Sequence, residues 1–223
     1  MTAEAGEGSP FAGKVWLAPL TFGGNLPFRR LCVELGAEVT VSEMAVVKKL
    51  LKDRNSEFAL LRSHQSEPFF GVQLADRHPD SLAEGARIAE AKGARFVDLN
   101  CGCPIDQMTR RGLGASLLQK PGRLARLVAS MVAAVKVPVT VKLRLGWREG
   151  HENASALAKG CEEAGGESRS RVALDVTGTE LAEPVHGLVL NVQLVTGTRS
   201  LAEHFFAPLL VRRLNDRPEG TTK

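Results

Sequence analysis

The stretch Pro138-Val139-Thr140-Val141-Lys142-Leu143-Arg144-Leu145 decides the fold, because its apolar and polar residues alternate from Val139 onward. In a strand, this alternation places the apolar side chains on one face and the polar ones on the other. If helices cover the apolar face, Lys142 points into a barrel near the carboxyl ends of the strands. A buried lysine without a partner costs roughly several kcal/mol. We therefore expect Lys142 to meet an anionic or accepting ligand, or else a strand-end carboxylate such as Glu43 or Asp98.

Strand and helix patterns alternate along the chain with short connections. We expect strands at residues 14–19, 38–43, 68–75, 95–100 and 138–145, and helices at 25–35, 53–64, 79–92, 122–135 and 153–164. This order predicts a parallel sheet, either doubly wound or closed as a (β/α)8 barrel. The segment after the first strand, Pro19-Leu20-Thr21-Phe22-Gly23-Gly24, does not match G-x-G-x-x-G, which weakens the dinucleotide-binding alternative.

Polar residues at the strand ends favour the barrel. Gln73 shares a face with Gly71, opposite the apolar residues of the same strand. Four separate strands thus bring Leu20, Gln73, Cys103 and Lys142 toward one rim, and (β/α)8 enzymes have their active sites at that rim. The sequence therefore predicts a TIM (β/α)8 barrel with a site at the carboxyl ends of its strands.

A cysteine corner follows the fourth expected strand, in the sequence Asn100-Cys101-Gly102-Cys103-Pro104. Proline fixes one backbone torsion and removes a donor, and glycine permits the turn before it. A thiol held this rigidly beside strand ends is suited to chemistry. The alternative is a cysteine that only packs, since free cysteines are among the most buried residues.

Composition narrows the class of protein. The chain has 223 residues, is 43% hydrophobic and carries a net charge of +4. It has no apolar run of the ~20 residues that a membrane span needs, and residues 1–10 lack the features of a signal peptide. Four scattered cysteines predict a reducing compartment, the cytoplasm or the nucleus, and they do not have the spacing of a structural metal site.

The basic pairs allow two interpretations. The mild positive charge is compatible with a polyanionic partner. Paired basic residues could line a groove or could be solvated helix ends. The residues concerned are Arg29-Arg30, Lys48-Lys49, Arg110-Arg111 and Arg123.

Several motifs between Lys14 and about Ala164 follow one another in an order that resembles a known family. They are Leu17-Ala18-Pro19-Leu20, Asn25-Leu26-Pro27-Phe28-Arg29-Arg30-Leu31, Ser42-Glu43-Met44, Gly71-Val72-Gln73-Leu74, Asp98-Leu99-Asn100-Cys101-Gly102-Cys103-Pro104, Arg111-Gly112-Leu113-Gly114-Ala115-Ser116-Leu117-Leu118 and Val141-Lys142-Leu143-Arg144-Leu145-Gly146-Trp147. The chain resembles the flavin-dependent tRNA-dihydrouridine synthases, and most of all the eukaryotic subclass that modifies the variable-loop uridine. The zinc-finger region of that subclass has no counterpart in this sequence.

The resemblance implies a cofactor site for FMN, with NADPH as the reductant and tRNA as the partner. Pro19, Leu20 and Thr21 would contact the isoalloxazine through their backbones. Gln73 would hydrogen-bond the polar edge of the ring, and Lys142 would stabilise the negative charge of reduced flavin.

The resemblance also implies substrate and catalytic residues. Asn100 and Arg144 would help to hold a uridine that has been flipped out of the RNA. Cys103 is the family's catalytic position, because it directly precedes the proline, and it would donate a proton to C5 of the uracil ring. Cys101 is expected to be a packing residue.

The resemblance ends near Ala164. We expect residues 1–13 to be a flexible segment, residues 14–164 a partial FMN-binding barrel of about five β/α units, and residues 165–223 a divergent, partly disordered tail. Val185-His186-Gly187 only superficially matches the family's next motif, and Leu188 to Val195 could form a strand. A barrel that stopped after five strands would lack a phosphate site, and we would then expect weak FMN binding.

Two alternatives to an active synthase follow. The chain could be a catalytically incompetent, truncated isoform that binds RNA or a partner. It could also be another flavin- or phosphate-binding barrel that acts on a small metabolite, although the cysteine corner argues against this.

Overall fold

A parallel sheet whose strands follow chain order forms the centre of the molecule. The computed structural model describes residues 10–11, 14–148, 150–165, 170–176 and 189–192. The strands are β1 (Trp16–Leu17), β2 (Val39–Val41), β3 (Ala45–Val46), β4 (Phe69–Ala75), β5 (Phe96–Asn100), β6 (Val139–Leu143), β7 (Ser170–Val176) and β8 (Val189–Val192). They pair in the order β1-β2-β4-β5-β6-β7-β8, all parallel, and β3 adds a short pairing to the end of β4. An order that never reverses is that of a barrel rather than of a doubly wound sheet.

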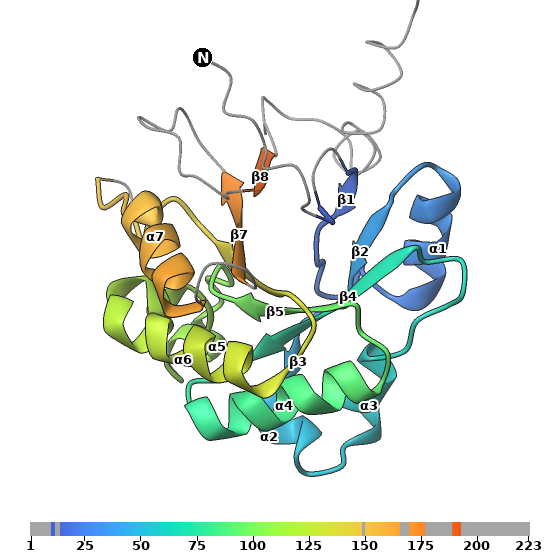
Figure 1. Ribbon diagram of the computed structural model, residues 1–223, viewed down its shortest axis with the longest axis horizontal. Coiled ribbons are helices and arrows are strands. Elements are labelled where there is room, and N and C mark those ends of the chain that lie inside the picture. The colour runs from blue at the N-terminus through green and yellow to red at the C-terminus, as the bar shows by residue number, and fades with distance from the viewer. Residues whose placement is uncertain (1–9, 12–13, 149, 166–169, 177–188, 193–223) are drawn as a thin grey trace, which may run out of the picture.

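Helices lie outside the curled sheet, as Figure 1 shows for α4, α6 and α7. The helices are α1 (Leu26–Glu34), α2 (Val47–Leu50), α3 (Asn55–Leu60), α4 (Pro79–Ala91), α5 (Asp106–Thr109), the 3₁₀ helix η1 (Gly114–Gln119), α6 (Pro121–Ala134) and α7 (Ala154–Gly165). α1 begins as the sequence predicts, because the Asn25 side chain accepts a hydrogen bond from the Phe28 N–H at 3.1 Å. The result is a partial (β/α)8 barrel, which confirms the predicted fold class.

The structure differs from the sequence prediction in the second β/α unit and after Ala164. The helix expected at 53–64 is shorter in the structure, as α3, and a further short helix, α2, precedes it across a turn in which Asp53 has a φ of 51°. β7 and β8 continue the sheet beyond the five strands that we expected. The Gly- and Ser-rich residues around 165–170 hid the start of β7, because they resemble a linker.

The two faces of the sheet divide as the alternation predicts. Val97, Leu99 and Val141 belong to the main core between the sheet and the helices. Their polar neighbours Asp98 and Thr140 face the barrel interior, where they hydrogen-bond to each other.

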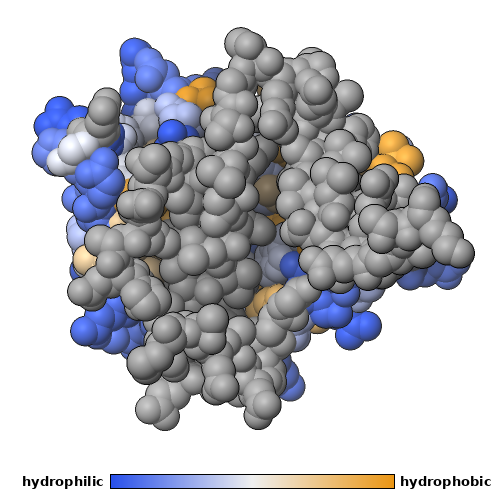
Figure 2. All heavy atoms as spheres, turned by 90° about the horizontal axis from the view of Figure 1, so that it is seen from above, coloured by the Kyte–Doolittle hydropathy of each residue, from blue (hydrophilic) through white to orange (hydrophobic). Residues whose placement is uncertain are grey.

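Seen from above in Figure 2, most of the side chains visible at the margin of the molecule are hydrophilic.

Aromatic rings fill the interior at the amino ends of the strands. Phe11 is 1% exposed and packs against Trp16, Phe69 and Phe96, with ring centroids 5.0 to 5.3 Å from its own. Gly71 leaves room for Phe96, because a Cβ at residue 71 would collide with that ring. Phe11 thus lies in the segment that we expected to be flexible, yet it closes this end of the barrel.

Candidate active site

A layer of polar side chains crosses the barrel interior toward the carboxyl ends of the strands. Gln73, Asp98 and Thr140 are register partners on β4, β5 and β6. The Gln73 amide Nε2 donates to Asp98 Oδ2 at 2.7 Å, and the Thr140 hydroxyl donates to Asp98 Oδ1 at 2.6 Å. All three side chains are buried, so these hydrogen bonds fix the direction in which the Gln73 amide points.

Asn100 links this layer to the cysteine corner. Its Nδ2 donates to Gln73 Oε1 at 2.8 Å. Its Oδ1 accepts from the backbone N–H of Cys103 at 3.0 Å and, at 3.3 Å, from that of Gly102. Because backbone N–H groups can only donate, Asn100 must turn its oxygen toward the corner and its amide nitrogen toward Gln73. The orientations of Gln73 and Asn100 therefore depend on each other.

Lys142 lies beside both the acidic layer and the corner. It pairs in register with Asn100, and its Nζ lies 3.9 Å from where a Cβ on Gly102 would be. Burial raises the pKa of Asp98, whereas the hydrogen bonds from Thr140 and Gln73 and the charge of Lys142 oppose that rise. Of the two strand-end carboxylates considered for Lys142, Asp98 is the one whose pKa the charge of Lys142 lowers.

Arg144 approaches the same corner from β6. Its Cγ lies 3.6 Å from the position of a Cβ on Gly102. The structure therefore brings Gln73, Asn100, Cys103, Lys142 and Arg144 together at the carboxyl ends of β4, β5 and β6, as the sequence predicts.

The cysteines near this site differ in their surroundings. Cys103 is partly exposed, whereas Cys101 is fully buried in the main core. Burial raises the pKa of the Cys101 thiol well above its usual range, and it raises that of Cys161 to about 12. Cys101 and Cys161 are therefore packing residues, and Cys103 is the thiol that a ligand can reach.

Residues 112–115 hold the cysteine corner from the other side. The Ala115 N–H donates to the Cys103 carbonyl oxygen at 2.9 Å. Gly114 has a φ of 59°, and a Cβ there would lie 2.5 Å from the same oxygen. A side chain at residue 114 would thus push Cys103 out of place, and the motif Arg111 to Leu118 supports the corner. Sequence reasoning noted the motif but missed this role.

The loop after β1 joins the site through Glu43, which sequence reasoning considered only as a partner of Lys142, and through Ser42, to which it gave no role. The loop contains Pro19, Leu20 and Thr21, and its Phe22 N–H donates to Glu43 Oε2 at 2.8 Å. The neighbouring Ser42 accepts from the Gln73 N–H at 3.0 Å and donates to the Glu43 carbonyl oxygen at 2.8 Å. Contacts therefore run without a break from the first strand end to Gln73.

A buried ion pair supports the same loop from behind. The Arg29 Nε donates to Glu67 Oε1 at 2.7 Å, and its Nη1 donates to the Gly24 carbonyl oxygen at 2.8 Å. The two side chains are 2% and 0% exposed. Arg29 is therefore neither a groove residue nor a solvated helix end, and the periodicity of α1 alone could not reveal a partner 38 residues away.

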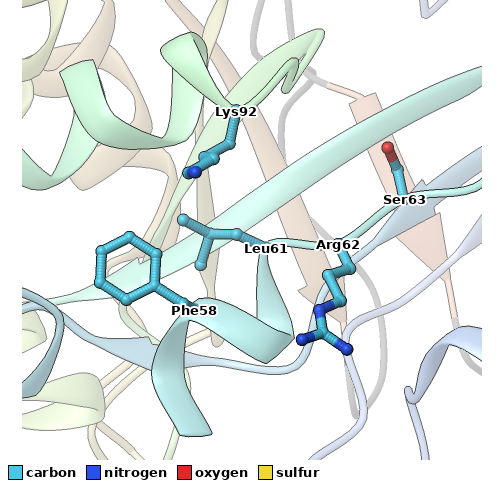
Figure 3. A pocket seen from close by; sticks show the side chains of 5 residues that line it. All are labelled: Phe58, Leu61, Arg62, Ser63 and Lys92. Carbon is cyan, nitrogen blue, oxygen red and sulfur yellow. The ribbon is translucent and has the colours of Figure 1, made fainter. Parts of the chain in front are cut away.

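A hollow of about 460 Å³ lies elsewhere, as Figure 3 shows, with Arg62 and Lys92 among its lining residues. Arg62 precedes β4 and Lys92 follows α4, so the hollow is at the amino ends of the strands. It is therefore separate from the cysteine corner.

Within the described residues, no His, Cys, Asp and Glu cluster could hold a metal ion, and no helix is long and apolar enough to cross a membrane.

Known proteins are similar in sequence to most of the described part of the chain. The family model for dihydrouridine synthase (Dus) matches residues 16–168. A Coprinopsis cinerea protein named tRNA-dihydrouridine(47) synthase, with the qualifier NAD(P)(+), is 45% identical over 149 residues, which are 65% of this chain and 22% of that protein. A Homo sapiens protein named as similar to that enzyme is 46% identical over 138 residues, 61% of this chain and 21% of the human protein.

The match covers only a small part of the length of the relatives. The chain spans about a fifth of the length of these curated relatives. The match nevertheless includes each motif from Leu17 to Trp147 and more than half of the chain. The chain belongs to the dihydrouridine synthase family.

Proposed function

We propose that this chain acts on tRNA as a dihydrouridine synthase, with FMN as cofactor and NADPH as reductant. The reaction would reduce the C5–C6 bond of a uridine. The names of the relatives support this substrate and reductant. The observation that carries the proposal is the position of Cys103, which is held at a strand-end mouth beside Lys142 and Asn100.

The residues at the mouth fit the polar edge of a flavin. Gln73 retains one amide hydrogen beyond the one given to Asp98, and Lys142 supplies a cation at the same rim. The backbone of Pro19, Leu20 and Thr21 lies in the loop after β1, which is separated from β4 by β2 in the sheet. The later loops, which hold the phosphate in many barrels, fall outside the described residues. Bound FMN would supply the hydride to C6 of the uracil ring.

Cys103 would complete the reduction by donating its thiol proton to C5. General acid catalysis of this kind contributes about 10²–10⁴-fold to a rate. The hydrogen bond from the Cys103 N–H to Asn100 and the packing of Gly114 would keep the sulfur in one place. Arg144 would contact the flipped uridine. The second amide hydrogen of Asn100, beyond the one donated to Gln73, would contact it too.

The continuation of the sheet by β7 and β8 favours this function over an incompetent fragment of five strands. A nuclear or cytoplasmic location stays a prediction from the cysteine pattern.

The variant Cys103→Ala tests the proposal. We expect dihydrouridine formation in an unmodified tRNA transcript to fall by about 10²-fold or more, while NADPH still reduces the bound flavin at the wild-type rate. The matched control is Cys101→Ala, which should keep its activity. Wild-type activity in Cys103→Ala would contradict the proposed role.

A further inference from the structure

Three arginines from separate segments meet around Gly112, beside the cysteine corner. Arg77 follows β4, Arg111 follows α5, and Arg123 lies in the first turn of α6. The Arg77 Cδ and the Arg123 Nη1 lie 3.7 and 3.9 Å from where a Cβ on Gly112 would be. The Arg77 Nη1 also donates to the Arg111 carbonyl oxygen at 3.1 Å. We call these three residues the arginine cluster.

The arginine cluster has no acidic partner of the kind that five other cations in the described residues have. Lys14, Arg29, Lys49, Arg87 and Arg110 each form an ion pair with a carboxylate. Among the described residues, no member of the cluster forms one. The Arg77 and Arg123 side chains both lie against Gly112, and their like charges repel each other, so this arrangement costs stability.

The position of the cluster increases that cost. α4 begins two residues after Arg77 and has Asp80 in its first turn, whereas α6 holds Arg123 in a first turn without an acidic residue. The amino end of a helix carries partial positive charge, which disfavours cations in the first turn. A bound polyanion would offset both the mutual repulsion and the unfavourable position of Arg123 at the start of α6.

The cluster is also close to the mouth of the site. Arg111 precedes Gly114 by three residues, which span at most about 11 Å, and Gly114 packs against the Cys103 carbonyl. Arg77 and Arg111 are exposed, and Arg123 is partly exposed. A strand of RNA that presents one base to Cys103 would have its neighbouring phosphates within reach of this surface.

We propose that the arginine cluster binds phosphates of the RNA backbone next to the uridine that enters the site. This inference rests on the proposed function, and it adds the surface over which the RNA strand runs. The contacts are to phosphate, so they position the RNA and do not read its sequence. A dinucleotide phosphate has the same chemistry, but three arginines on an exposed rim suit an extended chain of charges better.

The experiment compares two double variants in the full chain. Arg111→Glu/Arg123→Glu changes the cluster, and Arg62→Glu/Lys92→Glu makes the same change of charge at the hollow of Figure 3. An unmodified tRNA transcript is titrated at several salt concentrations. We expect the cluster variant to bind at least about tenfold more weakly, and its salt slope to fall by about 1.4 to 1.8, because two phosphate contacts are lost. The control should keep the wild-type affinity and slope.

Further measurements separate the ways in which the inference can fail. Equal losses of tRNA affinity in both double variants, or no loss in the cluster variant, would overturn the inference. If the wild-type protein still forms dihydrouridine in that case, the proposed function stands. A higher NADPH requirement for flavin reduction with unchanged RNA binding would also overturn it, in favour of a dinucleotide site. Wild-type protein that neither binds the transcript nor forms dihydrouridine would refute both proposals. If the glutamate variant does not fold, Arg111→Gln/Arg123→Gln gives the same comparison.

Discussion

Asp98 organises the site although it does not face the mouth itself. It accepts hydrogen bonds on both carboxyl oxygens, from Gln73 and from Thr140. The Gln73 oxygen is consequently free to accept from Asn100, which in turn accepts from the Cys103 N–H. The buried Asp98 carboxylate at one end and the backbone N–H of Cys103 at the other thus favour the same orientation of Gln73 and Asn100.

The variant Asp98→Asn tests the raised pKa of this buried acid through the pH dependence of the free energy of unfolding. The folded-state pKa of Asp98 is raised above its ordinary 3.8, because burial disfavours the charged form. The protonated acid therefore favours the folded state, and this contribution is lost as the pH rises from about 3.8 through the raised value. We expect the free energy of urea unfolding of the wild type, minus that of Asp98→Asn, to decrease across this range. A difference that is constant or increases with pH would contradict a raised pKa for Asp98.

Sequence alone predicted the residues at the mouth, because strand alternation determined the faces of Gln73 and Lys142, and the ends of their strands determined the positions of Cys103 and Leu20. Gln73, Cys103, Lys142 and the loop containing Leu20 all lie at the rim as expected. The roles of Asp98 and Gly114 depend on contacts between segments that are not adjacent in sequence. Local pattern cannot reveal such contacts.

At the scale of elements, the segment between α5 and α6 acts as a support for the cysteine corner. We expect Gly114→Ala to destabilise the fold by about 1–3 kcal/mol, because residue 114 has a positive φ and its Cβ would meet the Cys103 carbonyl oxygen. Thermal or urea unfolding measures the loss.

The control for this change is Gly160→Ala in α7, where a Cβ would meet no atom within 4 Å. Alanine should stabilise that helix by about 0.5–1 kcal/mol. A Gly114→Ala protein as stable as the wild type would show that the corner does not depend on close packing at residue 114.

The ion pair between Arg29 and Glu67 connects α1 to the segment that enters β4. Removal of one partner leaves a buried charge, so Arg29→Met should cost about 3–5 kcal/mol of unfolding free energy. The double variant Arg29→Met/Glu67→Met should lose less than the sum of the two single variants. Strictly additive losses in urea unfolding would contradict a coupled pair.

At the scale of the whole molecule, the order of strands along the sheet was predictable and its extent was not. The alternation of strands and helices up to Ala164 predicted a parallel sheet, the polar residues at the strand ends favoured a barrel, and the strands pair in chain order. β7 escaped prediction because the residues before it are rich in Gly and Ser, whereas β8 lies within Leu188 to Val195, a segment that we expected could form a strand. The buried ring of Phe11 was missed for a similar reason, since it follows a Gly-rich segment.

Titration of the purified chain with FMN, followed by flavin fluorescence, tests the central claim that the strand ends form one flavin-binding mouth. We expect one FMN per wild-type chain, binding weakened at least about tenfold by Lys142→Gln, and no change in Lys159→Gln, which removes an exposed lysine from α7. A wild-type chain that binds no FMN, or a Lys142→Gln variant that binds it as tightly as the wild type, would contradict the account.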